Sequence, residues 1–187
     1  MTPLGRMRSG PSLNDLPGKN ARQRYWPGHR KHASRWKKEP LLQNTSGKIA
    51  MNGNVVLDSG IIAAIFFPET ISGKAIALAE RYDCTTVDLA YSEVANVGWK
   101  RAVYAGQDRE AVKSALDECL AFIRETCEVI PAQDLVHEAC DLACSHRITI
   151  YDALFLAGAV RTKAPLVTAD TKLHTAAWKI VKAELVR

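Results

Sequence analysis

Short runs of aliphatic and β-branched residues alternate with longer segments whose apolar residues recur at helical spacing. The short runs predict buried strands at 55–57, 85–87, 127–130 and 166–168. The longer segments predict helices over 59–67, 72–82, 89–103, 108–125, 134–145, 151–162 and 172–178. Asp88 is the predicted N-cap of the helix over 89–103, Gly98 marks a candidate break in it, and the tail 178–185 predicts an edge strand.

Strands of three or four residues separated by helices are typical of a mainly parallel sheet with helices on both faces. The pattern therefore predicts one three-layer α/β domain over residues 51–187. In such sheets ligands bind at the carboxyl ends of the strands, where the loops leave a crevice. Residues that follow the strands are therefore the first place to look for a functional site.

The first fifty residues differ from the rest. Residues 1–50 carry eleven Lys or Arg, two Asp or Glu and five of the eight prolines, with no helical or strand period. This composition predicts a disordered basic extension. Two interpretations stay open: an arm that binds nucleic acid through its charge and the stacking residues Tyr25, Trp26 and Trp36, or a leader that precedes a native start at Met51.

Composition excludes two broad classes. With 47% hydrophobic and 24% charged residues, the chain is typical of a globular protein. Its five cysteines are an odd number without a repeating framework, which favours a reducing cytoplasm over a secreted disulfide scaffold. No apolar run approaches the roughly 18 residues that a membrane span requires. We expect a cytoplasmic protein with no membrane partner.

Four acids fall where the predicted sheet opens. Asp58 follows the first strand, Asp170 follows the strand over 166–168, Asp152 opens the helix over 151–162, and Glu93 lies early in the helix after the second strand. Each aspartate alone has a simpler explanation as a helix cap. Together, however, carboxylates at one rim repel one another unless protons or cations compensate. Ligation by oxygen alone suits Mg²⁺ or Mn²⁺.

The segments that carry these acids show a family resemblance. "NVVLDSGIIAAIFFPE", "DLAYSEVANVGWKR", "ITIYDALFLAGAV" and "PLVTAD" resemble, in order and spacing, the four acidic motifs of PIN-domain ribonucleases, and of VapC-like toxins in particular. The resemblance covers about residues 52–187. It implies a PIN-like fold, with Asp58, Glu93, Asp152 and Asp170 as catalytic metal ligands and Ser59 and Thr168 as supporting polar neighbours.

The same resemblance implies an activity and partners. It implies a toxin endoribonuclease in which Mg²⁺ or Mn²⁺ activates water for attack on an RNA phosphodiester. It also implies a VapB-like antitoxin and a homodimer, for which Phe66, Phe67, Trp99 and Tyr104 offer apolar surface. Lys100 and Arg101 are candidates for contacts with RNA phosphates, although a solvated helix end explains them equally well.

Other functions remain to be weighed against this one. A PIN nuclease that is not a toxin, or a PIN module that binds RNA without cleaving it, is the main alternative. A phosphatase of the haloacid dehalogenase type needs a second aspartate two residues after the first, and residue 60 is Gly. His137, Cys140 and Cys144, with His146 nearby, have a spacing that would suit zinc. Because all lie on one helix, the two cysteines are better explained as small core residues.

Overall fold

The computed structural model describes residues 53–187, so the predicted extension over 1–50 and the predicted start at Met51 lie outside the described residues. The described part is built on one five-stranded sheet in which every pair of neighbouring strands is parallel. The strands lie in the order β3-β2-β1-β4-β5. Their bounds are Asn54–Leu57 for β1, Asp83–Val87 for β2, Glu128–Ile130 for β3, Leu166–Thr168 for β4 and Ala183–Leu185 for β5.

The strand order reverses direction once, beside β1. From β1 the chain adds β2 and then β3 on one side, and it later returns to add β4 and β5 on the other. Val56 of β1 is paired with Leu166 of β4, and Leu57 with Val167. A crevice forms at such a reversal because the connections leave the two central strands on opposite faces of the sheet. The carboxyl ends of β1 and β4 are therefore the expected binding position.

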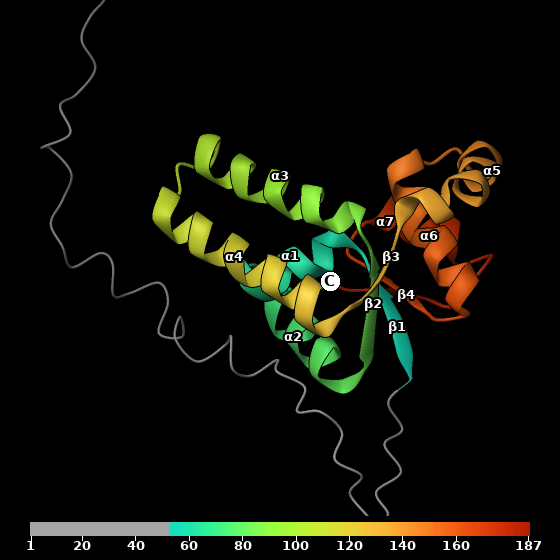
Figure 1. The fold of residues 1–187 in the computed structure, drawn as a ribbon, viewed down its shortest axis with the longest axis horizontal. Helices are drawn as coiled ribbons and strands as arrows, with labels where there is room; N and C mark the ends of the chain where they lie inside the picture. Colours follow the sequence, from blue (N-terminus) through green and yellow to red (C-terminus); the bar gives the residue numbers. More distant parts are fainter. Residues whose placement is uncertain (1–52) are drawn as a thin grey trace, which may run out of the picture. The chain divides into compact units, whose positions relative to one another are not determined.

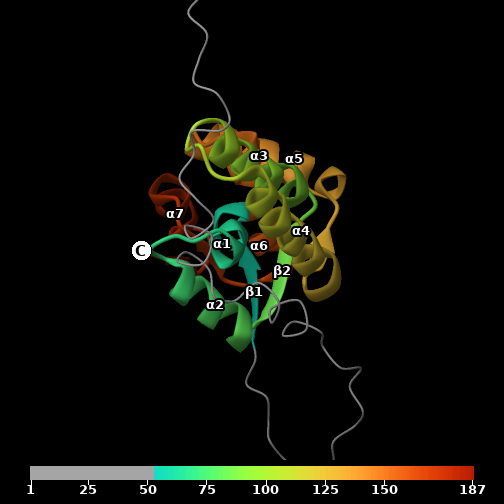
Figure 2. The same cartoon turned by 90° about the vertical axis from the view of Figure 1, so that its left-hand side faces the viewer.

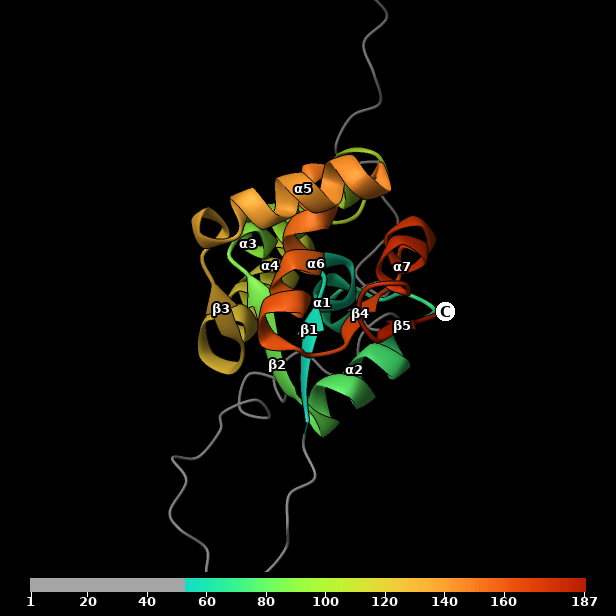
Figure 3. The ribbon, with the colours of Figure 1, turned by 90° about the vertical axis from the view of Figure 1, so that its right-hand side faces the viewer.

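Helices cover both faces of the sheet, as the sequence predicts. The four helices shown at the front of Figure 2 lie on one side: α1 (Ser59–Phe66), α2 (Ser72–Arg81), α3 (Leu89–Val103) and α4 (Arg109–Thr126). On the other side, facing the viewer in Figure 3, lie α5 (Val136–His146) and α6 (Ile150–Thr162). The last helix, α7 (Thr171–Ala177), packs against β4 and β5. Figure 1 shows the sheet edge-on between these layers.

Two apolar helices form the centre of the core. In α1, every residue from Ile61 to Phe66 is buried, and in α6 every residue from Ala153 to Ala159 is buried. Each is enclosed because α1 packs under α2, α3 and α4, whereas α6 lies between the sheet and α5. Burying one large aliphatic or aromatic side chain contributes about 1.5–3 kcal/mol. The segments on either side of the site are thus the most firmly held parts of the domain.

Two local expectations are wrong, and a third holds over a shorter range than expected. Helix α3 runs without a break through Gly98, because a Cβ there would lie 3.3 Å from Val112 Cγ1, so the glycine serves close packing of α3 against α4. Asp88 does not cap α3 through its side chain; its Oδ1 accepts a hydrogen bond from the Ala132 N–H at 2.9 Å and joins the end of β2 to the segment after β3. The edge strand β5 is confined to Ala183–Leu185.

No helix within residues 53–187 is both long enough and apolar enough to cross a membrane.

Candidate active site

A pocket with a volume of about 340 Å³ lies at the carboxyl ends of β1 and β4. All four acids predicted from the sequence line it. Ser59, which follows Asp58, lines it as well. The remaining lining residues are Gly60, Phe155, Ala169 and Leu173. The structure therefore brings these four acids together at one rim, where the sequence predicts them.

Asp58 is the innermost carboxylate of the pocket. It follows β1 directly, and only 6% of its surface is exposed. Its Oδ1 accepts a hydrogen bond from the Ile61 N–H at 2.8 Å and so caps α1. Its Oδ2 accepts a hydrogen bond from the hydroxyl of Thr168, which is itself fully buried at the end of β4. Both oxygens are therefore fixed by neighbouring backbone and side chain.

The environment of Asp58 opposes its ionisation. Burial raises its pKa to about 6, and the nearby carboxylates of Glu93 and Asp170 add to the effect. The hydrogen bonds from Thr168 and from the Ile61 N–H act in the opposite direction, because they favour the charged form. A buried acid with a raised pKa, in a pocket with other acids, is typical of a functional site.

Glu93 reaches the pocket from the second turn of α3. It is half-buried, and its carboxylate accepts a hydrogen bond from the hydroxyl of Ser59. Burial raises the pKa of Glu93, and the charge of Asp152 raises it further; the Ser59 hydrogen bond and the charge of Lys100 lower it. The effect of Asp152 on the pKa of Glu93 shows that α3 and α6 bring the two carboxylates close to each other.

The other two acids, Asp170 and Asp152, lie at the N-terminal ends of helices at the mouth of the pocket. Asp170 is exposed; its Oδ1 accepts hydrogen bonds from the N–H groups of Lys172 at 2.6 Å and Leu173 at 2.8 Å, and so caps α7. Asp152 lies in the first turn of α6, which begins at Ile150 and is capped by the hydroxyl of Thr149. Helix capping and a place in the pocket are therefore compatible for Asp170, whereas Thr149 takes the capping role expected of Asp152.

Four lining residues were missed by the sequence analysis, namely Gly60, Phe155, Ala169 and Leu173. A Cβ at Gly60 would lie 3.3 Å from Asp58 Oδ1, so the glycine keeps the approach to that carboxylate open. Phe155 follows Asp152 by three residues, and one helical turn brings the two side chains to the same face. Helical spacing from Asp152 was the signal that would have found Phe155, whereas nothing in the local sequence distinguishes Gly60.

The donor set suits a hard divalent cation. Four carboxylates with no sulfur or imidazole ligand line one pocket, and the pKa values of Asp58 and Glu93 are raised partly by their neighbours' charge, which a cation would offset. Across residues 53–187, no group of three or more His, Cys, Asp or Glu side chains is already arranged to hold a metal ion. Binding an ion would thus require the less buried carboxylates to turn towards it.

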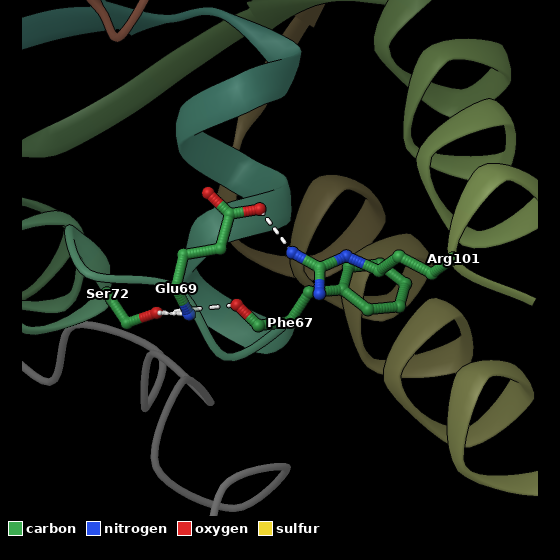
Figure 4. Close-up of polar contacts among 4 residues, drawn as sticks. All are labelled: Phe67, Glu69, Ser72 and Arg101. Atoms are coloured by element: carbon green, nitrogen blue, oxygen red, sulfur yellow. Dashed lines mark hydrogen bonds and ion pairs between the residues drawn. The ribbon is translucent and has the colours of Figure 1, made fainter. Parts of the chain in front are cut away.

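Figure 4 shows that Arg101 has partners within the domain. Its guanidinium forms an ion pair with Glu69 and lies over the ring of Phe67, 5.1 Å from the ring centroid. The Ser72 hydroxyl accepts a hydrogen bond from the Glu69 N–H at 2.9 Å, so the same cluster joins α3 to the turn between α1 and α2. The side chain of Arg101 is only 16% exposed. This arrangement weighs against Arg101 as a contact for RNA phosphates, whereas Lys100 is exposed.

Two of the four apolar residues expected at a homodimer interface are buried in the domain. Phe66 and Phe67 are buried, because they close the core where α1 ends, and they are not available to a second molecule. Trp99 and Tyr104 are exposed, and their rings pack edge to face with centroids 5.3 Å apart. Any interface built on the expected residues would therefore use the end of α3 alone.

The cysteines of α5 are not core residues, contrary to expectation. Cys140 and Cys144 are exposed, because α5 turns Ala139 towards α6 and leaves the neighbouring positions in solvent. His137, on the same helix, is also exposed. The described residues contain no group of three such side chains placed to bind a metal, so the zinc alternative gains no support from the structure.

Comparisons with known proteins agree with the fold. A model of the PIN domain matches residues 55–179. Ribonuclease VapC3 from Pyrobaculum aerophilum is 32% identical to this chain over 120 residues, which are 64% of this chain and 91% of that protein. The match includes the segments that carry Asp58, Glu93, Asp152 and Asp170 within the PIN domain.

Two solved structures were found to be similar to this chain. The crystal structure of PAE2754 from Pyrobaculum aerophilum has a TM-score of 0.55 at 24% identity and covers 77% of this chain and 92% of that one. FitAcB from Neisseria gonorrhoeae has a TM-score of 0.49 at 16% identity and covers 69% of this chain and 95% of that one. The likeness to the first structure shows a shared fold.

Proposed function

Because this chain belongs to the PIN-domain family, we propose that it is a metal-dependent endoribonuclease and the toxin of a VapBC-type toxin–antitoxin pair. The observation that carries the proposal is the convergence of Asp58, Glu93, Asp152 and Asp170 on one pocket at the strand reversal. The similarity to a protein named as a VapC ribonuclease supports RNA as the substrate.

The four carboxylates would hold Mg²⁺ or Mn²⁺. When bound, such an ion supplies a water of lowered pKa and neutralises the charge that develops on the phosphoryl oxygens. Asp58 provides the fixed point of the site, because its position is set by α1 and by Thr168. Glu93, Asp152 and Asp170 are less buried and can turn towards an ion at lower cost.

The neighbouring residues have supporting tasks in this proposal. Thr168 and Ser59 donate hydrogen bonds that favour the charged forms of Asp58 and Glu93, so they keep these acids available as ligands. Phe155 and Leu173 give the pocket an apolar wall, which limits water around the scissile bond. Lys100, exposed on α3 and close enough to affect Glu93, would hold an RNA phosphate.

The toxin proposal has consequences for the partners of the protein and for its location in the cell. A VapB-like antitoxin would bind the domain and block cleavage, and a homodimer would use Trp99 and Tyr104 at the end of α3. We place the protein in the cytoplasm, where RNA is available and where its free thiols stay reduced.

Cleavage of RNA by the purified full chain tests the proposal. We expect cleavage with Mg²⁺ or Mn²⁺ and none in EDTA, and Asp152→Asn should lower the rate by at least ~10²-fold because one ligand charge is lost. No side-chain hydrogen bond holds Asp152 within the described residues, so the asparagine should not disturb α6. The matched control is Asp141→Asn, an exposed acid on α5 outside the pocket.

The outcomes separate the alternatives. Full activity in Asp152→Asn, with circular dichroism unchanged in both variants, would contradict the assigned role. RNA binding without cleavage under any metal would favour a PIN module that recruits RNA. Cleavage of RNA without growth arrest on expression would favour a PIN nuclease that is not a toxin. Growth arrest that a co-expressed antitoxin does not release would favour the same alternative.

A further inference from the structure

A second hollow adjoins the active-site pocket. It has a volume of about 480 Å³ and lies between the end of α5 and one side of α7. It is lined by two lysines, a histidine, two threonines and two apolar residues. These residues are His146, Ile148, Thr171, Lys172, Thr175, Ala176 and Lys179. We call this hollow the α7 groove. No acidic residue lines it.

The first turn of α7 is shared by the α7 groove and the active-site pocket. Asp170 and Leu173 line the pocket, whereas Thr171 and Lys172 line the groove. Because these four residues are consecutive, a ligand that leaves the pocket over α7 enters the groove directly. The groove is therefore placed to hold the part of a long ligand that adjoins the reacting group.

The groove is basic within an acidic domain. Residues 53–146 carry seven Lys or Arg and fifteen Asp or Glu, whereas residues 147–187 carry seven Lys or Arg and only three Asp or Glu. Two of those three acids are Asp152 and Asp170, which belong to the pocket. Neither Lys172 nor Lys179 forms an ion pair with another described residue, and both are exposed. Their charges are therefore available to a ligand.

We propose that the α7 groove binds phosphates of the RNA strand next to the scissile phosphodiester, an inference that rests on the proposed ribonuclease function. Ammonium and hydroxyl donors are the groups that contact nucleic-acid phosphates, and such contacts position a strand without reading its sequence. The groove supplies both kinds of donor, through Lys172 and Lys179 and through the hydroxyl of Thr171; the Thr175 hydroxyl donates to the Thr171 carbonyl at 2.7 Å. On α3, by contrast, Arg101 is paired with Glu69, so its charge is not available to a ligand.

Binding of RNA by an inactive protein tests the proposal separately from cleavage. In the full chain carrying Asp152→Asn, the double variant Lys172→Gln and Lys179→Gln should bind a fluorescent oligouridine about tenfold more weakly than the parent. The slope of log K against log salt should fall in magnitude by ~1.4, as expected for two lost phosphate contacts on a single strand. The matched control, Lys163→Gln with Lys182→Gln, removes the same charge from exposed positions of the same region outside the groove.

The outcomes are distinct. Equal affinity and equal salt slope in the groove and control variants would overturn the proposal, as would an absence of RNA binding by the parent. Groove-dependent binding of polyglutamate as tight as that of oligouridine would also overturn it, because the partner would then be an acidic protein. Groove-dependent RNA binding by a protein that never cleaves would leave the groove proposal standing and reject the ribonuclease function.

Discussion

Asp58 and Asp170 occupy equivalent positions and have different surroundings. Each follows one of two neighbouring parallel strands, β1 and β4, and each caps the next helix through Oδ1. Asp58 is nearly enclosed and its Oδ2 accepts a hydrogen bond from Thr168, whereas Asp170 is exposed. The difference arises because Asp58 precedes the fully packed α1, and Asp170 precedes the seven-residue α7 beside the edge strand.

Helix capping therefore uses one oxygen of each acid, and burial decides how firmly the other oxygen is held. Thr168 connects the two acids, because its hydroxyl donates to Asp58 and accepts a hydrogen bond from the Asp170 N–H at 2.9 Å. The inner acid is fixed and costly to ionise; the outer acid is free to follow a ligand. We expect substitutions to separate these two properties.

The largest contrast should appear in RNA cleavage. Asp58→Asn should lower the rate by about 10²–10³-fold, because the charge of the fixed ligand is lost. Asp170→Asn should lower it by only about 10–100-fold, since an exposed ligand is replaced more readily by water and asparagine caps α7 as well as aspartate does. Single-turnover cleavage of one RNA under saturating Mn²⁺ measures both. Equal losses would show that burial does not distinguish the two acids.

Thr168→Val should have a smaller effect on the same reaction. Valine matches the shape of threonine but neither donates to Asp58 nor accepts from the Asp170 N–H, so both acids lose orientation. Loss of such a supporting contact lowers activity by about 10–100-fold. The free energy of unfolding should fall by ~1–3 kcal/mol, because a buried hydroxyl bond is lost. Thr168→Ser keeps the hydroxyl and serves as the control. If the activity of Thr168→Ser were as low as that of Thr168→Val, loss of the hydrogen bond would be excluded as the cause.

The sequence predicts the elements and the acids for one physical reason. Short apolar strands leave little freedom in where a parallel sheet ends, and residues after such strands must meet at its carboxyl edge, so the positions of Asp58 and Asp170 follow from periodicity. The contacts that lie far apart along the chain do not follow. Arg101 meets Glu69 across 32 positions, and only the packing of α3 against α1 determines that contact.

The burial of apolar side chains was predicted less well than the elements. The cysteines of α5 lie one position from the stripe that contains Leu135 and Ala139, so a modest rotation of the helix decides whether they face α6 or solvent. The sequence alone fits Phe66 and Phe67 equally well as buried residues at a helix end or as an exposed apolar patch. The packing of α3 and α4 against them decides that they are buried. A sequence pattern identifies an amphipathic segment, whereas the partner helix decides which part of it is covered.

The smallest expected effect concerns stability without metal. Burial raises the pKa of Asp58 from 3.8 to about 6, so between these pH values the folded state holds a proton that the unfolded state has released. The free energy of unfolding therefore falls as pH rises from about 4 to about 6, by about 3 kcal/mol at full ionisation. Asp58→Asn removes the cost of ionising a buried carboxylate. The variant should therefore be more stable than wild type at pH 7 in EDTA, by about 1–3 kcal/mol, although its rate of RNA cleavage is lower.

Urea unfolding at pH 4 and pH 7 in EDTA measures the difference, and Asp170→Asn is the control. Asparagine caps a helix as well as aspartate, and Asp170 is exposed, so its substitution should change stability by no more than ~0.5 kcal/mol at either pH. Adding Mn²⁺ should then raise the stability of wild type more than that of Asp58→Asn, since a ligand that binds the folded state stabilises it. A stability gap between wild type and Asp58→Asn that does not change with pH would mean that burial does not raise the pKa of Asp58.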